Sequence, residues 1–389
     1  MHRPDHSTAD PNGISTGVPG YTEGDPTAPV ARTVVTDDQM NDVVEGLCQA
    51  VEASGVSLVK NDYAQIADVF LRYAETNFRE HAGANAETDD LLDVCSTGTL
   101  LVSVGRNGQI QTSPDGVFWT ARTAAGAFAG DFEGVCHGNS LFVAVGTSAE
   151  IQTSPDGTTW TQRTAAGGYA SSFQAVTYDG TNYIAVGSTG EIQTSPDGTT
   201  WTSRRTSSDG TETIHGIAAN ADYAIATGTS DLLIVSSDNG VTWSAPTTPP
   251  SASGSRSFFG AVVLADGSAW VGADDTDAEV WRSTDDGDTW SEWTYYNSNF
   301  AGAVLHDFVE TPYGVAGIVT NAGLAGEWDN GTQILFRPRD LATGSGLTDD
   351  LSAVPIRVSF VNFHGICRHR NATIIVGNDN RTFHSHRFG

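Results

Sequence analysis

Lysine is almost absent from this chain of 389 residues. The sequence has one lysine, Lys60, beside 18 arginines, and 33 aspartates stand beside 14 glutamates, so that the formal charge is −28. Lysine is normally among the commonest residues. Short, strongly hydrated carboxylates keep a surface wet at molar salt, where the Debye length falls to about 3 Å. The composition therefore predicts a halophilic protein.

Other absences exclude whole classes of protein. The sequence has no basic stripe that could bind nucleic acid, and no apolar run approaches the ~20 residues of a membrane span. We therefore expect neither a nucleic acid as partner nor insertion into a membrane. Met1–Asp5 has no apolar segment behind it, and we expect no cleavable signal peptide. The four cysteines are too few for a disulfide scaffold and have no CxxC spacing, so we expect no metal and no cofactor.

The first 89 residues predict an attachment region. Residues 1–36 are rich in Gly, Pro, Thr, Ser and Asp, and they predict an extended arm. Residues 37–89 predict a short α-helical hairpin, with helices over about 37–53 and 62–79. Its apolar stripe needs a partner, so we expect a homo-oligomer formed through residues 1–90; the stripe consists of Met40, Val43, Val44, Leu47 and Val51.

From about residue 90 the sequence consists of short β runs that repeat. Gln109–Gly116 returns as Glu150–Gly157 and again as Glu191–Gly198. The tryptophans that close the units are spaced 41, 41, 42 and 47 residues apart. A period in the forties with four short strands per unit is typical of a β-propeller.

Two more, degenerate units bring the count to seven. We therefore predict a mainly β chain with a seven-bladed β-propeller over residues 90–389, carried on the N-terminal arm and hairpin. The seventh unit ends at Gly389, where its fourth strand should begin, and an open edge is a liability. Ala31–Thr36 has the composition to supply the missing strand.

The repeats resemble the Asp-box of bacterial neuraminidases, with the pattern Ser-x-Asp-x-Gly-x-Thr-Trp. Ser236–Trp243 and Ser283–Trp290 have this form, and three units have a form one residue shorter. The resemblance implies a turn between the third and fourth strands of each blade, on the face opposite the ligand site. The resemblance implies a structural role for the aspartates and tryptophans of the boxes, which are Asp115, Asp156, Asp197, Asp238 and Asp285, with Trp119, Trp160, Trp201, Trp243 and Trp290.

The N-terminal region resembles the attachment region of tail-fibre proteins of tailed viruses. The resemblance rests on the Gly/Pro-rich start and on Thr36–Met40, Gly55–Leu58 and Asp62–Ile66. Together with the propeller and the composition, it implies a virion surface protein, a tail fibre or spike, with other virion proteins as partners.

Catalysis is the weaker hypothesis. Asp-box sialidases resemble one another in an arginine triad, a Tyr–Glu pair, an Asp acid and a Phe/Tyr-Arg-Ile-Pro motif before the first box. Nothing before Ser113 matches that motif, and Phe336–Arg339 lies after the last box. We therefore expect no enzyme, and glycoside hydrolysis ranks third among the functions considered.

Binding by the face without boxes is the leading hypothesis. The second residues of the first strands would lie at one level of the ring. They include the candidate ligand-binding residues Glu133, His215, His306 and His364. The alternative is that these residues only fill a solvated channel mouth. Aromatic faces stack on sugars, or cover blade edges. The aromatic candidates are Phe128, Tyr169, Trp293, Tyr295, Tyr296 and Trp328.

We thus expect a non-enzymatic virion protein that attaches to a host-surface glycan or glycoprotein at high salt. The alternative is a structural capsid turret or decoration protein. Variable loops on a rigid scaffold favour recognition over a purely structural role.

Overall fold

A computed structural model describes residues 78–84, 89–250, 256–274, 279–293, 303–311, 314–321, 332–338, 352–354, 363–370, 372–377 and 380–385. The chain divides into two compact units, residues 1–77 and 78–389. The expected arm, the candidate strand Ala31–Thr36 and nearly all of the helical hairpin lie outside the described residues.

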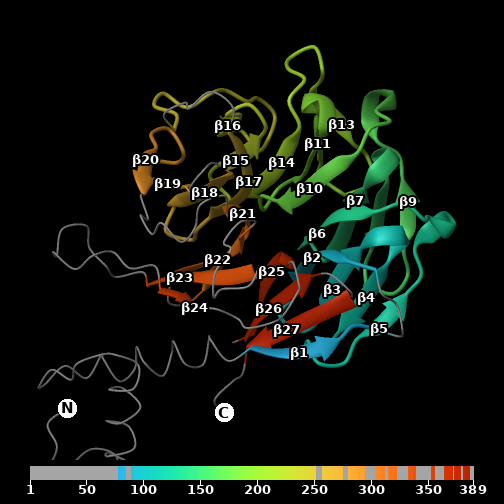
Figure 1. Ribbon diagram of the computed structural model, residues 1–389. Coiled ribbons are helices and arrows are strands. Elements are labelled where there is room, and N and C mark those ends of the chain that lie inside the picture. The colour runs from blue at the N-terminus through green and yellow to red at the C-terminus, as the bar shows by residue number, and fades with distance from the viewer. Residues whose placement is uncertain are drawn as a thin grey trace, which may run out of the picture. The chain divides into compact units, whose positions relative to one another are not determined.

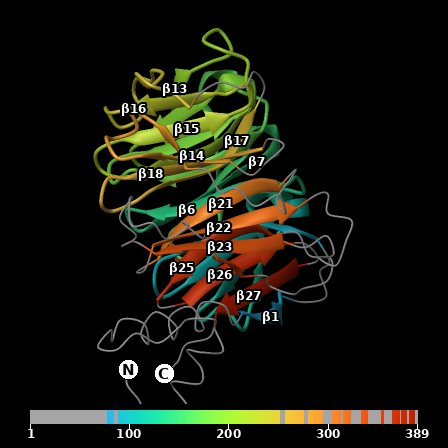
Figure 2. The same cartoon turned by 60° about the vertical axis from the view of Figure 1, so that its left-hand side comes forward.

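The described residues form antiparallel sheets that follow one another along the chain (Figures 1 and 2). Sheet 1 contains β2 (Leu91–Ser96), β3 (Leu101–Gly105), β4 (Ile110–Ser113) and β5 (Thr120–Arg122). Sheet 2 contains β6 (Phe132–Gly138), β7 (Leu141–Gly146), β8 (Ile151–Ser154) and β9 (Thr161–Arg163). Sheet 3 contains β10 (Phe173–Tyr178), β11 (Tyr183–Gly187), β12 (Ile192–Ser195) and β13 (Thr202–Arg205).

The remaining sheets repeat this order with one exception. Sheet 4 contains β14 (Ile214–Ala219), β15 (Ala224–Gly228) and β16 (Leu233–Ser236). Sheet 5 contains β17 (Ser257–Val263), β18 (Ala269–Asp274), β19 (Glu279–Ser283) and β20 (Ser291–Trp293). Sheet 6 contains β21 (Ala303–Thr311), β22 (Gly314–Asn321), β23 (Thr332–Pro338) and β24 (Ser352–Val354). Sheet 7 contains β25 (Phe363–His369), β26 (Ala372–Gly377), β27 (Arg381–Ser385) and β1 (Phe78–Ala82).

Each sheet begins with its inner strand, and the inner strands contact one another in a ring. β2 contacts β6, each inner strand contacts the next, and β25 contacts β2 again. Short 3-10 turns link the second strand to the third, or the fourth to the next sheet: η1 (Arg106–Gly108), η2 (Ala125–Ala127), η3 (Thr147–Ala149), η4 (Ala166–Gly168) and η5 (Ser188–Gly190). This arrangement is a β-propeller, as the repeats predicted.

The core lies between successive sheets. One cluster joins Val143 and Val145 of sheet 2 to Phe173 and Tyr183 of sheet 3, and all four side chains have no exposed surface. Similar clusters join sheet 1 to sheet 2, sheet 3 to sheet 4, sheet 4 to sheet 5, and sheet 7 to sheet 1. Sheets 1 to 4 therefore bury both of their faces against their two neighbours, which is why apolar residues dominate their second strands.

Sheet 4 has three strands because proline interrupts the fourth. Val235 and Ser244 form one isolated bridge, and the chain then continues through Pro246, Pro249 and Pro250. Proline cannot donate to a strand ladder. Thr248 instead pairs with Thr289 beside sheet 5, so this segment links the two sheets.

Sheet 7 is completed by a strand from before the repeats, but not by the expected one. Phe78–Ala82 pairs antiparallel with β27, from Phe78 opposite Ser385 to Ala82 opposite Arg381 (Figure 1). The prediction of Ala31–Thr36 was therefore wrong, and so was a helix that extends to residue 79. The described residues contain no helical hairpin, and the propeller unit begins at Phe78 rather than at residue 90.

Candidate functional site

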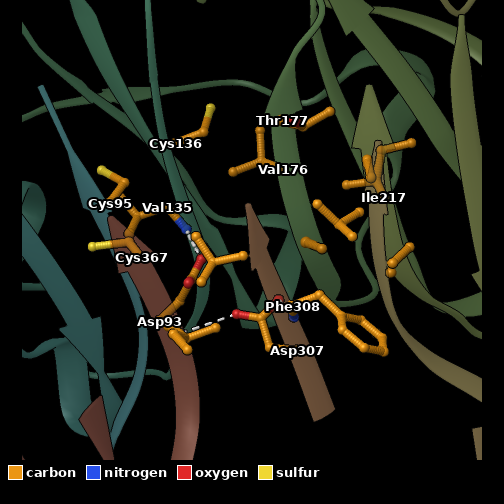
Figure 3. Close-up of a pocket in the computed structure, with 18 of the residues that line it drawn as sticks. Asp93, Cys95, Val135, Cys136, Val176, Thr177, Ile217, Asp307, Phe308 and Cys367 are labelled. Atoms are coloured by element: carbon orange, nitrogen blue, oxygen red, sulfur yellow. Dashed lines mark hydrogen bonds between the residues drawn. The ribbon is translucent and has the colours of Figure 1, made fainter. Parts of the chain in front are cut away.

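The inner strands surround a central channel with a cavity of ≈ 490 Å³. Residues of β2, β6, β10, β14, β17, β21 and β25 line it (Figure 3). Because the strands alternate in direction, the inner strands begin at the end of the ring opposite the turns that join the third and fourth strands. We call the end where they begin the channel mouth, and the other the turn end.

A β-bulge at the start of the inner strands directs side chains to the channel mouth. The register shifts between Phe132 and Gly134, so Glu133 lies outside the ladder. The same shift occurs in sheets 1, 3, 4 and 7. A bulge re-aims one side chain. The residues that it brings into one cavity are Leu92, Glu133, Gln174, His215 and His364, and Phe259 joins them from a wider bulge in sheet 5. His306 lies in β21, with its side chain outside the described residues.

The channel mouth combines a carboxylate, an amide, imidazoles and an aromatic ring. The rings of His215 and Phe259 stack, with centroids 4.6 Å apart and planes at 29°. Burial raises the pKa of Glu133, the neighbouring Asp131 carboxylate adds to the effect, and Arg106 opposes it. Such a set can hydrogen-bond hydroxyl groups and stack on an apolar ring face.

Two aspartates lie deeper in the channel, each at the first paired residue after the bulge of its inner strand. Asp93 Oδ1 accepts the N–H of Val94, and its Oδ2 accepts the N–H of Val135 in sheet 2, both at 2.7 Å. Asp307 Oδ1 accepts the N–H of Phe308 at 2.7 Å, and its Oδ2 accepts that of Ile366 in sheet 7 at 3.1 Å. Each carboxyl group therefore ties its own sheet to the next.

Both carboxyl groups are weak acids. Burial raises the pKa of Asp93 to about 7, against the effect of its two N–H donors. Burial and the charge of Asp93 raise the pKa of Asp307 to about 8. Desolvation and a like charge both disfavour the carboxylate. At neutral pH this pair therefore holds protons that ordinary aspartates would have lost.

These two aspartates were not among the residues predicted from the sequence, although a signal was present. The first paired residue after the bulge is Gly or Ala in the other sheets, as at Gly134, Ala175 and Gly216. Neighbouring strands approach closely there, since a Cβ on Gly365 would lie 2.8 Å from the Cα of Asp93. A charged residue at a position otherwise kept small indicates a special contact.

Three cysteines also line the channel, each in a different sheet. Cys136 packs in the core cluster between sheets 2 and 3, and Cys367 packs in the cluster between sheets 7 and 1. Cys95 packs against the cluster between sheets 1 and 2. All three are free thiols whose pKa is raised by burial. They are therefore small core residues with little thiolate character.

The turns at the turn end of sheets 1 to 5 are alike, and each is held by its own hydrogen bonds. Asp156 Oδ1 accepts the N–H groups of Thr158 and Thr159 at 2.8 and 2.9 Å, and the turns at Asp115, Asp197, Asp238 and Asp285 have related bonds. The turn glycine Gly198, at φ +69°, packs against Leu141 of the preceding sheet. The tryptophans donate to the turn-glycine carbonyls, as Trp160 does to Gly157 at 3.1 Å. These aspartates hold turns.

The two aromatic candidates whose side chains the structure describes are packing residues. Phe128 contacts Phe132 with ring centroids 4.8 Å apart, and Tyr169 contacts Phe173 at the same distance. The Tyr169 hydroxyl donates to the carbonyls of Ser172 and Ser188. Both rings cover the start of an inner strand. Trp293 is the last residue of β20, and its side chain is not among those described. Tyr295, Tyr296 and Trp328 lie wholly outside the described residues.

Within the described part of the chain, no three His, Cys, Asp or Glu side chains are grouped so that they could hold a metal ion. None of the helices described there is long and apolar enough to span a membrane.

Comparisons with known proteins agree with the fold. The model of a family described as the DUF6242 beta propeller domain matches residues 113–301. The uncharacterized protein StfP of Escherichia coli (strain K12) is 39% identical over 66 residues, which are 17% of this chain and 32% of that protein. The chain thus matches about a third of that relative's length.

Solved structures show the same architecture at low identity. YCF48 bound to D1 peptide has a TM-score of 0.58 at 15% identity, over 80% of this chain and 95% of that one. Virginiamycin B lyase from Staphylococcus aureus has a TM-score of 0.61 at 12% identity, over 79% of this chain and 98% of that one. The chain contains a β-propeller, and identities this low carry the fold alone.

Proposed function

We propose that this protein is a non-enzymatic attachment protein on the surface of a virion. Its seven sheets form a seven-bladed propeller of Asp-box repeats, which binds a host-surface glycan or glycoprotein in a high-salt environment. The observation that carries the proposal is the contrast between the two ends of the ring. The turns of sheets 1 to 5 are closed by their own hydrogen bonds, whereas the channel mouth presents polar side chains on bulges.

The mouth chemistry favours a hydroxyl-rich ligand. Glu133 and Gln174 can accept and donate hydrogen bonds, and the His215–Phe259 stack offers a ring. Recognition sites combine a few placed polar groups with apolar surface in this way. The carboxyl groups of Asp93 and Asp307 already accept backbone N–H groups, which supports a structural role for them rather than the acid and base roles of a glycosidase.

Adsorption to host cells tests the proposal. The triple variant Glu133→Ala, Gln174→Ala, His215→Ala removes three contacts of about 1 kcal/mol each, so its affinity should fall roughly a hundredfold. The control is Phe118→Ala with Val241→Ala, which trims two exposed apolar side chains at the turn end. Loss of adsorption in the control alone would reverse the proposed orientation. Wild-type adsorption by both variants would favour the capsid turret or decoration role.

We also propose that the remaining aromatic candidates from the sequence contribute to binding of the ligand. Trp293, Tyr295, Tyr296 and Trp328 come from segments of variable length, and each stacking contact is worth on the order of 1 kcal/mol. Changing Tyr295, Tyr296 and Trp328 to Ala should weaken adsorption without lowering the thermal midpoint. Weakened folding instead would make them packing residues, like Phe128.

We further propose that residues 1–90 form the homo-oligomer and join other virion proteins. The apolar stripe of residues 40–51 supports this, since exposed stripes of this kind are buried in assemblies. Val44→Asp with Leu47→Asp should give a folded, monomeric propeller by light scattering. An unchanged oligomer would place the contact elsewhere.

A further inference from the structure

The inner strands turn one edge toward the channel, and the residues that point away from the neighbouring strand direct both their N–H and their C=O groups there. Val135 and Ile366 donate theirs out of their own sheets, to Asp93 and Asp307. In an antiparallel ladder, residues alternate between those that bond to the neighbouring strand and those that point away. Val135 pairs with Ala144 and Ile366 with Ile375, so both pairs are of the kind whose N–H groups point away.

The same register recurs in the sheets on the opposite side of the ring. Val176 pairs with Ala185, and Ile217 pairs with Ala226, each one residue past the same bulge. Their N–H groups therefore point into the channel as that of Val135 does. Figure 3 shows Val176 and Ile217 on the far side of the cavity from Asp93 and Asp307.

The two aspartates serve four of these donors and leave the others uncovered. Sheets 3 and 4 have Ala175 and Gly216 at the position of the aspartates, and no described side chain accepts from Val176 or Ile217. Gly134 also keeps the approach clear, since a Cβ there would lie 3.3 Å from the nitrogen of Val176. Uncovered backbone N–H groups that converge on a cavity are a site for an anionic acceptor.

We propose that the N–H groups of Val176 and Ile217 bind a carboxylate group of an external ligand inside the channel. The carboxylate bridges two sheets as Asp93 bridges Val94 and Val135. The cavity of ≈ 490 Å³ accommodates a small carboxylate. The structure itself supports a ligand with a carboxyl group, because the carboxyl groups of Asp93 and Asp307 accept the equivalent N–H groups in sheets 1, 2, 6 and 7.

Binding of such an anion is coupled to protons. The titratable or charged groups that line the cavity are Asp93, Glu133, His137, His215, Asp307, His364 and Arg368, with the thiols Cys95, Cys136 and Cys367. Asp93 and Asp307, with pKa values of about 7 and 8, repel an anion when ionised and donate a hydrogen bond when protonated. Affinity therefore rises as the pH falls through this range, up to about tenfold per pH unit for each proton taken up.

The test uses the full chain, with acetate as the probe at constant ionic strength. Amide resonances of Val176 and Ile217 should shift with acetate at a pH of about 6, and weakly at about 8.5. Acetamide, which is neutral and nearly the same shape, should leave them unmoved. Equal shifts with acetamide, preferential binding of methylammonium, or no shifts with acetate would each overturn the proposal.

A designed variant fills the site from within. Ala175→Asp places a carboxyl group next to Val176, as Asp93 lies next to Val94, and should lower the affinity for acetate at least tenfold. Ala221→Asp makes the same change of charge in an exposed turn and should retain wild-type affinity. Acetate binding by Ala175→Asp at wild-type strength would refute the site. Asp93→Asn with Asp307→Asn should keep the acetate shifts and flatten their pH dependence, and an unchanged pH dependence would refute the coupling even if Ala175→Asp misfolds.

Discussion

Ala84 donates its backbone N–H to Oε1 of Gln111 over 2.7 Å. Ala125 and Ala166 make the same contact with Gln152 and Gln193, each at 2.8 Å, one and two repeats later. The segment after β1 thus binds sheet 1 as the segments after β5 and β9 bind sheets 2 and 3. β1 is therefore the fourth strand of a complete unit, although it lies at the other end of the chain.

Truncation should show that β1 closes the ring. A chain that begins at Phe78 keeps all five pairs with β27 and should retain the thermal midpoint of the propeller. A chain that begins at residue 85 loses these pairs and the Ala84 contact. A loss of roughly 2 kcal/mol would lower the midpoint by about 3 °C in calorimetry. Equal midpoints for the two chains would contradict this role of the strand.

Stability should depend on pH through Asp93 and Asp307. Their pKa values rise from 3.8 in the unfolded chain to about 7 and about 8, so the folded state binds protons more tightly. The stabilisation is complete below a pH of about 4 and is lost as the pH rises through about 8. Thermal midpoints should therefore fall between a pH of about 5.5 and about 8.5.

The double variant Asp93→Asn, Asp307→Asn should flatten this fall, because an amide does not titrate. Each amide oxygen can accept only one of the two N–H groups that the carboxyl group accepts, so the variant should be less stable at low pH. Asp222→Asn, in an exposed turn, should leave the fall in place. If the double variant still loses stability as steeply, other groups cause the dependence.

The turn aspartates should contribute to stability and not to adsorption. Asp197→Ala removes acceptors for the N–H groups of Thr199 and Thr200 and should cost about 1 kcal/mol in urea denaturation. Asp197→Asn keeps an oxygen and should cost less. A loss of host adsorption at unchanged stability would show that the turn end binds the host.

The charge of −28 should make stability depend on salt. The free energy of unfolding should rise from about 0.1 M to about 3 M NaCl, beyond the range in which simple screening saturates. Denaturation at several salt concentrations measures this. A propeller equally stable at both limits would remove the argument for adaptation to high salt.

The turns and the repeats could be predicted from the sequence because their chemistry is local. Ser154, Asp156 and Trp160 lie within seven residues, and the hydrogen bonds that hold the turn join groups two or three residues apart. The bulge residues at the channel mouth followed from alignment of the inner strands alone. A local pattern that recurs predicts the same structure at each copy, so the copies support one another.

The closing strand was predicted in the wrong place because its partner is remote. Phe78–Ala82 has no Ser-x-Asp turn before it, and its composition is not that of the other fourth strands. One signal existed in the repeat period. Residues 79–81 lie 41 positions before Thr120–Arg122 of β5, just as Leu91 lies 41 positions before Phe132. Composition favoured Ala31–Thr36, whereas the repeat period pointed to the observed strand.

The sequence by itself determined the sheets, their order and the turns, since strand alternation and turn chemistry act over a few residues. Only the tertiary structure decided what meets in the channel. Asp93 and Val135 are 42 residues apart, and Asp307 and Ile366 are 59 apart, yet each pair forms one hydrogen bond. Such contacts depend on ring closure, which brings inner strands edge to edge around one axis, and no local pattern encodes that geometry.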